Sequence, residues 1–212
     1  MKMRNFEEIR EFVEREIIPR YNDFDAGHDV DHVKTVIAEA LKLSCHYPEV
    51  DKCILLVAAA YHDLGLAGGR QKHHILSAAI IRADERLQRW FSKEEIDTIA
   101  DAAEDHRASS DHEPRTIYGR IVAEADRIID SETIVRRTLQ FGMSHEPDLD
   151  REGHYRRLME HMQEKYAEGG YISLWLPDSP NAAPLAELRE LIRDKERVTG
   201  MIDHFLDEYL KS

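Results

Sequence analysis

Residues 53–65 of this 212-residue chain have the sequence CILLVAAAYHDLG, and this stretch decides the fold. It is apolar on nearly all sides of a helix, and such a helix belongs in the centre of a helical bundle. We expect the helix to run from Lys52, with Asp51 as its N-cap, to about Asp63. His62 and Asp63 close this buried helix, and they need partners because an unpaired buried polar group is costly.

Helical periodicity continues on both sides of this stretch. Apolar residues recur every three to four positions, and Ser92-Lys93-Glu94-Glu95 forms a capping box that opens a helix ending near residue 106. The other predicted helices cover about residues 5–18, 28–45, 74–90, 117–130, 132–141, 153–168 and 185–210. No segment keeps the two-residue alternation of a strand, so the sequence predicts an all-α fold.

The predicted helices are organised as a single all-helical domain over residues 1–212. A core over about residues 26–130 is followed by a C-terminal helical extension, about 140–212, that packs on it. A separate C-terminal interaction hairpin is the alternative. The apolar positions of the last helix need a cover, and the sequence leaves open whether the bundle or a homodimer interface supplies it.

Charge and hydropathy exclude several classes of partner. The chain has 29 basic and 42 acidic residues and a net charge of −13, so we expect no nucleic acid polymer as a partner. A small phosphorylated substrate remains compatible with this charge, because a bound cation reverses the local field. No run approaches the roughly 18 apolar residues of a membrane span. We therefore expect no membrane association and a cytoplasmic location, in keeping with two cysteines, Cys45 and Cys53, that lack paired spacing.

Histidine is the unusual component, with twelve residues in the chain. Several of them stand beside each other or beside aspartates, and a lone Asp126 lies in an apolar helix. Such mixed imidazole and carboxylate ligands suit a divalent ion, Mn, Fe, Co, Ni or Mg, better than a structural zinc. Two histidines with two carboxylates would neutralise one such ion and leave positions open for water and substrate.

Four of these residues follow the order of a known motif. The chain resembles the HD-domain superfamily of metal-dependent phosphohydrolases, whose motif is a histidine, a His-Asp pair and a distant aspartate. The matching residues are His32, His62, Asp63 and Asp126. Their neighbours match as well, including Val33 and Val36 after the first histidine and the Ala125-Asp126-Arg127 context. The resemblance covers about residues 26–130, roughly half of the chain.

The resemblance implies an HD-domain-like helical bundle with these four residues as metal ligands. It also implies hydrolysis of a small phosphorylated molecule, with a nucleotide as the favoured class and a phosphomonoesterase or pyrophosphohydrolase as the enzyme. The Gly-Tyr-Pro motif of the branch that acts on cyclic dinucleotides is missing from this sequence, so that substrate is not carried over.

Some members of the superfamily hold a second metal with histidines from the two helices between the pair and the last aspartate. His74 and His106 stand at these positions and are predicted as second-metal or phosphate contacts. His73 lies about 100° from His74 around a helix, so we expect it at the surface. His28 and Arg70 are further candidates for second-metal or phosphate contacts.

The expected catalytic residues are Asp63, His106 and Arg107. Asp63 would support in-line attack on phosphorus, and His106 and Arg107 would stabilise charge on the phosphoryl oxygens. Two alternatives remain open. One is a non-catalytic sensor or scaffold that binds a metal or nucleotide, and the other is a di-iron oxygenase of the same superfamily.

Overall fold

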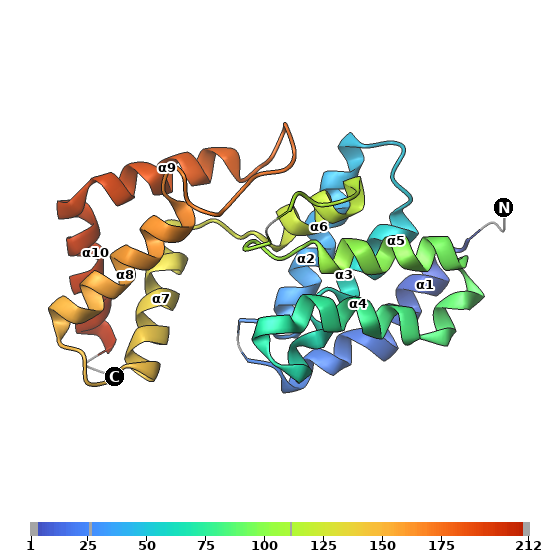
Figure 1. Cartoon of the computed structure of the whole chain (residues 1–212), viewed down its shortest axis with the longest axis horizontal. Coiled ribbons are helices and arrows are strands. Elements are labelled where there is room, and N and C mark those ends of the chain that lie inside the picture. The colour runs from blue at the N-terminus through green and yellow to red at the C-terminus, as the bar shows by residue number, and fades with distance from the viewer. Residues whose placement is uncertain (1–3, 26, 111, 210–212) are drawn as a thin grey trace. The chain divides into compact units, whose positions relative to one another are not determined.

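The computed structural model describes residues 4–25, 27–110 and 112–209, and within these ranges the chain forms helices and no strand (Figure 1). The all-α prediction is therefore confirmed. The helices are α1 (Phe6–Phe12), α2 (Val30–Leu43), α3 (Lys52–Tyr61), α4 (His73–Ala83), α5 (Lys93–Glu104), α6 (Ile117–Asp126), α7 (Ser131–His145), α8 (Arg151–Tyr166), α9 (Ala182–Arg193) and α10 (Lys195–Tyr209). Of the helices described, none has the length and hydropathy needed to cross a membrane.

The chain divides into two compact units. The first unit holds the chain up to Arg127 and adds Trp175–Pro177, and the second holds Ile128–Leu174 and the part from Asp178 on. Helices α1 to α6 belong to the first unit, and α7 to α10 belong to the second. The first boundary lies close to the end of the predicted core, and the organisation as a single domain stays a prediction.

Helix α3 is the centre of the first unit. Every residue from Cys53 to Tyr61 is buried, and α1, α2, α5 and α6 pack around this helix. Its start is held by Asp51, whose side chain accepts a hydrogen bond from Cys53 N at 2.8 Å. Arg4 forms ion pairs with Asp51 and with Glu95 of α5, so the N-terminal segment ties the two helices together.

Aspartates interrupt two of the predicted helices. The helix expected over 74–90 ends at Ala83, and Asp84 then caps a short 3-10 helix through a hydrogen bond from Arg86 N. The helix expected over 185–210 is broken at Asp194, whose carboxylate accepts from Arg197 N at 3.1 Å. An aspartate competes in this way with the helical backbone bonds of its own segment.

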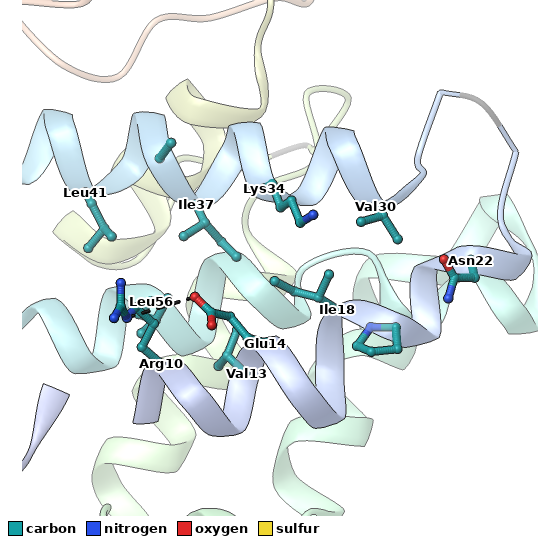
Figure 2. Close-up of a pocket in the computed structure, with 12 residues that line it drawn as sticks. Arg10, Val13, Glu14, Ile18, Asn22, Val30, Lys34, Ile37, Leu41 and Leu56 are labelled. Carbon is teal, nitrogen blue, oxygen red and sulfur yellow. Dashed lines mark ion pairs between the residues drawn. The ribbon is translucent and has the colours of Figure 1, made fainter. Parts of the chain in front are cut away.

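A groove of about 700 Å³ separates α2 from the segment that follows α1 (Figure 2). Its walls include Val13, Ile18, Val30, Ile37 and Leu41, and none of the predicted site residues lines it. Residues two positions apart on a helix point about 200° apart, so His32 faces away from the side of α2 that carries Val30 and Lys34. This groove is therefore separate from the histidine cluster.

The turn after α3 packs closely against α4 through a glycine. Gly65 N donates a hydrogen bond to Ser77 Oγ at 2.9 Å. A Cβ atom at Gly65 would lie 2.0 Å from His73 O and 2.6 Å from Ser77 N, and both of these are backbone atoms. Only glycine allows this approach, which brings the start of α4 next to the His-Asp pair.

We predict that Gly65→Ala destabilises the protein by about 1–3 kcal/mol, the usual cost of overpacking a close contact. Denaturant unfolding followed by circular dichroism measures this change. The control is Gly200→Ala in α10, where nothing lies within 4 Å of the added Cβ. The control should stabilise its helix by up to about 1 kcal/mol. Wild-type stability in Gly65→Ala would contradict the close approach.

Candidate metal centre

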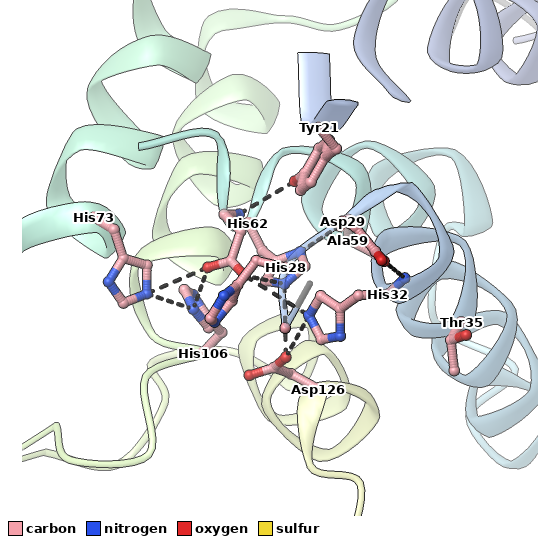
Figure 3. Close-up of polar contacts among 12 residues, drawn as sticks. Tyr21, His28, Asp29, His32, Thr35, Ala59, His62, His73, His106 and Asp126 are labelled. Atoms are coloured by element: carbon pink, nitrogen blue, oxygen red, sulfur yellow. Dashed lines mark hydrogen bonds and ion pairs between the residues drawn. The ribbon is translucent and has the colours of Figure 1, made fainter. Parts of the chain in front are cut away.

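Four side chains named by the sequence meet in the first unit. His32 lies in the first turn of α2, and Asp126 is the last residue of α6. His62 and Asp63 directly follow the last residue of α3. The ligand atoms of these four residues all lie within 4.8 Å of one another (Figure 3), and we call them the first ligand group.

Hydrogen bonds fix the position of His32 and the ring orientation of His62. His32 N donates to the Asp29 carboxylate at 2.9 Å, which caps α2 and sets the position of His32 in the first turn. His62 Nδ1 lies 2.7 Å from Ala59 O. Because a carbonyl oxygen only accepts, Nδ1 carries the proton and Nε2 is left to face the group. Bonds of this kind fix the tautomer and ring orientation of metal-binding histidines.

The imidazole nitrogens and the carboxylate oxygens of the first group converge. His32 Nε2 lies 3.1 Å from Asp126 Oδ1, and His62 Nε2 lies 3.2 Å from Asp63 Oδ2. Both Nε2 atoms are buried and have no hydrogen-bond partner among the residues that the structure describes. Two nitrogen and two carboxylate donors that converge in this way fit one divalent cation.

The carboxylate charges of the first ligand group also favour a bound cation. Burial would lower the pKa of His62, but the carboxylates of Asp63 and Asp126 raise it well above its usual value. Burial would raise the pKa of both carboxyl groups, but the surrounding imidazoles hold both pKa values well below their usual range. Both carboxylates are therefore ionised at neutral pH and attract a cation.

A second ligand group shares Asp63. His73 Nε2 and His106 Nε2 lie 3.3 Å and 3.4 Å from Asp63 Oδ1, and Figure 3 shows both rings beside the first group. The other oxygen of this carboxylate, Oδ2, faces His32 and His62. Asp63 thus presents one oxygen to each group, and it would be a ligand of an ion held in either of them.

The two histidines of the second group are oriented in the same way as His62. His106 Nδ1 donates to Ala103 O, and His73 Nδ1 donates to Arg70 O at 2.7 Å. In each case the carbonyl belongs to the residue three positions earlier, and Nε2 is directed at Asp63. Burial and the neighbouring His106 lower the pKa of His73 to about 4, so its imidazole is neutral at pH 7.

The second group corrects one prediction. His73 belongs to the group and His74 does not, although the sequence favoured His74 and placed His73 at the surface. The two ring centroids lie 5.5 Å apart on neighbouring positions at the start of α4, and only one of them faces Asp63. The packing of α4 against the turn after α3 decides which one. A phosphate contact by His74 stays a prediction.

The remaining predicted residues surround the two groups. The His28 ring lies 5.8 Å from the His32 ring, and Arg70 Nη2 lies 3.4 Å from His28 Nε2. Arg107 Nε donates to Ser109 Oγ at 2.9 Å, and its Nη1 donates to Gln71 O. His106 holds a ligand position, and the roles predicted for His28, Arg70 and Arg107 on phosphate stay predictions.

Comparison with known proteins identifies one family. The family model of the HD domain matches residues 29–129, a range that contains both ligand groups. No curated protein and no solved structure matches the chain. The match extends over nearly the same residues as the resemblance found in the sequence.

Neighbouring histidines provide a matched test of the second ligand group. We predict that His73→Ala weakens binding of a second divalent ion by more than about tenfold, whereas His74→Ala leaves it unchanged. Isothermal titration with Co²⁺ and metal analysis after dialysis measure both variants. Equal metal binding by wild type and His73→Ala would rule out the second group as a metal site.

Proposed function

This chain belongs to the HD-domain family, and from that premise we propose that it hydrolyses a phosphate ester or anhydride of a small molecule. The superfamily consists mostly of metal-dependent phosphohydrolases. The observation that supports the proposal is the division of the Asp63 oxygens between two sets of imidazole nitrogens. A nucleotide is the substrate class that we favour.

The donor atoms fit one divalent ion in each group, chosen from Mn, Fe, Co, Ni and Mg. When bound, such an ion lowers the pKa of a coordinated water and polarises a phosphoryl oxygen. His32, His62 and Asp126 would hold the first ion, and His73 and His106 would hold the second. Asp63 would be a ligand of both.

We assign different tasks to the predicted catalytic residues. Asp63 stays ionised because its pKa is well below the usual range. The role of a metal ligand that orients the attacking water therefore suits it better than the role of a general base. His106 takes part as a ligand of the second group. Arg107 uses Nε for Ser109 of its own loop and Nη1 for the carbonyl of Gln71, which precedes α4. Its Nη2 has no partner among the described residues and is available to a phosphoryl oxygen.

Asp25, His28 and Arg70 form a chain of polar contacts next to the first group. His28 Nδ1 lies 2.7 Å from Asp25 Oδ1, and Arg70 Nη1 lies 3.8 Å from Asp25 Oδ2. The Arg70 side chain is 63% exposed, and exposed ion pairs of this kind contribute little free energy. A substrate phosphate group can therefore replace Asp25 as the partner of Arg70.

A di-iron oxygenase is the second candidate, because a centre with four imidazoles and two carboxylates also suits iron. Iron retained through purification, together with an absorbance change under oxygen, would favour this candidate. Metal binding without hydrolysis or oxygen chemistry would favour the sensor or scaffold.

The first functional prediction concerns the reaction itself. Wild-type protein with Mn²⁺, Co²⁺ or Mg²⁺ should release phosphate or pyrophosphate from nucleoside mono- or triphosphates. Asp63→Ala should lose both bound metal and activity, because both groups lose a ligand. Asp97→Ala, which removes a surface carboxylate of α5, is the control and should keep both. Full activity in Asp63→Ala would contradict the proposal.

The second functional prediction concerns Arg70. Arg70→Ala should raise KM about 10-fold with little change in kcat, the pattern expected when a group binds substrate and transition state equally. The backbone carbonyl that orients His73 is unchanged in this variant, so metal content should match that of wild type. Lys72→Ala removes a neighbouring surface cation and is the control. An unchanged KM in Arg70→Ala would remove it from the phosphate site.

A further inference from the structure

Tyr21 connects the N-terminal segment to the backbone of the His-Asp pair. Its side chain is fully buried, and its hydroxyl donates to Ala60 O at 2.9 Å. The same hydroxyl accepts a hydrogen bond from Asp63 N at 3.3 Å. Figure 3 shows the Tyr21 side chain directed at this turn. Tyr21 lies between the helices predicted over 5–18 and 28–45, and no sequence motif connects it with Asp63.

The Tyr21 hydroxyl provides a hydrogen-bond partner for backbone groups that lack one at the end of α3. The last carbonyl groups of a helix have no partner within the helix, and a buried one must find a partner elsewhere. His62 Nδ1 satisfies Ala59 O, and Tyr21 satisfies the next carbonyl, Ala60 O. Asp63 has left the helix, with φ −109° and ψ 3°, so its N–H also depends on a partner from outside α3.

We propose that Tyr21 is a positioning residue that sets the orientation of Asp63 before any metal binds. The side chain of an aspartate is short, so the direction of its carboxylate follows from the backbone at its own position. Tyr21 holds that backbone at the amide and at the carbonyl three residues earlier. This arrangement directs Oδ2 to the first ligand group and Oδ1 to the second.

The segment that carries Tyr21 is wound in an irregular way. The helix predicted over 5–18 is α-helical only to Phe12, and it continues as a π turn over Val13–Ile17 and a 3-10 helix over Ile18–Asp23. Ile17 and Tyr21 are both fully buried. Single π turns within helices are often found at functional sites, and this one ends four residues before the tyrosine that reaches Asp63.

Tyr61 provides a matched control for the loss of a buried hydroxyl. It is also fully buried, and its hydroxyl donates to Asp84 Oδ2 at 2.7 Å. Tyr61 lies in α3 directly before His62, but this hydroxyl makes no contact with Asp63. Tyr61→Phe therefore carries a comparable loss of hydrogen bonding without releasing the Asp63 backbone.

The inference rests on the proposed sharing of Asp63, and its test measures metal binding rather than turnover. Isothermal titration with Co²⁺ and the visible spectrum of bound Co²⁺ report affinity and ligand geometry. Tyr21→Phe should bind Co²⁺ about 10- to 100-fold more weakly, the usual effect of losing a residue that orients a ligand. Its spectrum should also change, whereas Tyr61→Phe should match wild type in both.

Two results would overturn the positioning role. One is wild-type Co²⁺ affinity and spectrum in Tyr21→Phe, and the other is an equal loss of affinity in Tyr61→Phe. Amide hydrogen exchange on the wild-type protein supplies a test that needs no variant. The Asp63 amide should exchange slowly even without metal, and rapid exchange that becomes slow only with Co²⁺ would also overturn the proposal. If the wild type binds Co²⁺ but hydrolyses no phosphate compound, the proposed function fails and the positioning role stands.

Discussion

The two oxygens of the Asp63 carboxylate face different sets of imidazole nitrogens, and the geometry of the centre depends on this division. His62 lies toward Oδ2, and His73 and His106 lie toward Oδ1. A buried carboxylate is costly unless positive charge compensates it, so these residues form a stable arrangement only around protons or cations. Both ligand groups meet at a side chain that is 4% exposed, which keeps water from screening the interaction.

The position of Asp63 follows from the end of one buried helix. The apolar sides of α3 place this helix at the centre of the first unit, and the chain leaves the helix at the His-Asp pair. Carbonyl groups freed at this point accept hydrogen bonds from His62 and from Tyr21. The groups that complete the helix end thus also orient the ligands. His73 and His106 follow the same rule, since each donates Nδ1 to the carbonyl three residues before it.

Much of the fold could be predicted because its signals are local. The apolar helix, the N-cap at Asp51 and the capping box at Ser92 each depend on residues that are close in sequence. The interruptions at Asp84 and Asp194 were missed, because an aspartate in a helical pattern either points to solvent or caps a new helix. Nearby residues favour both outcomes by similar amounts, and packing decides between them.

For the site, the sequence by itself determined the residue types and their order: His32, the His-Asp pair and Asp126 on helical segments, with further histidines between them. The tertiary structure decided which neighbouring side chains meet. His73 rather than His74 faces Asp63, because α4 approaches the turn at Gly65 from one side only. The tertiary structure also brought the Tyr21 hydroxyl to the backbone amide of Asp63, which lies 42 residues away in the sequence. Helical periodicity states which residues share a face, but the partner of that face depends on contacts between segments far apart in the chain.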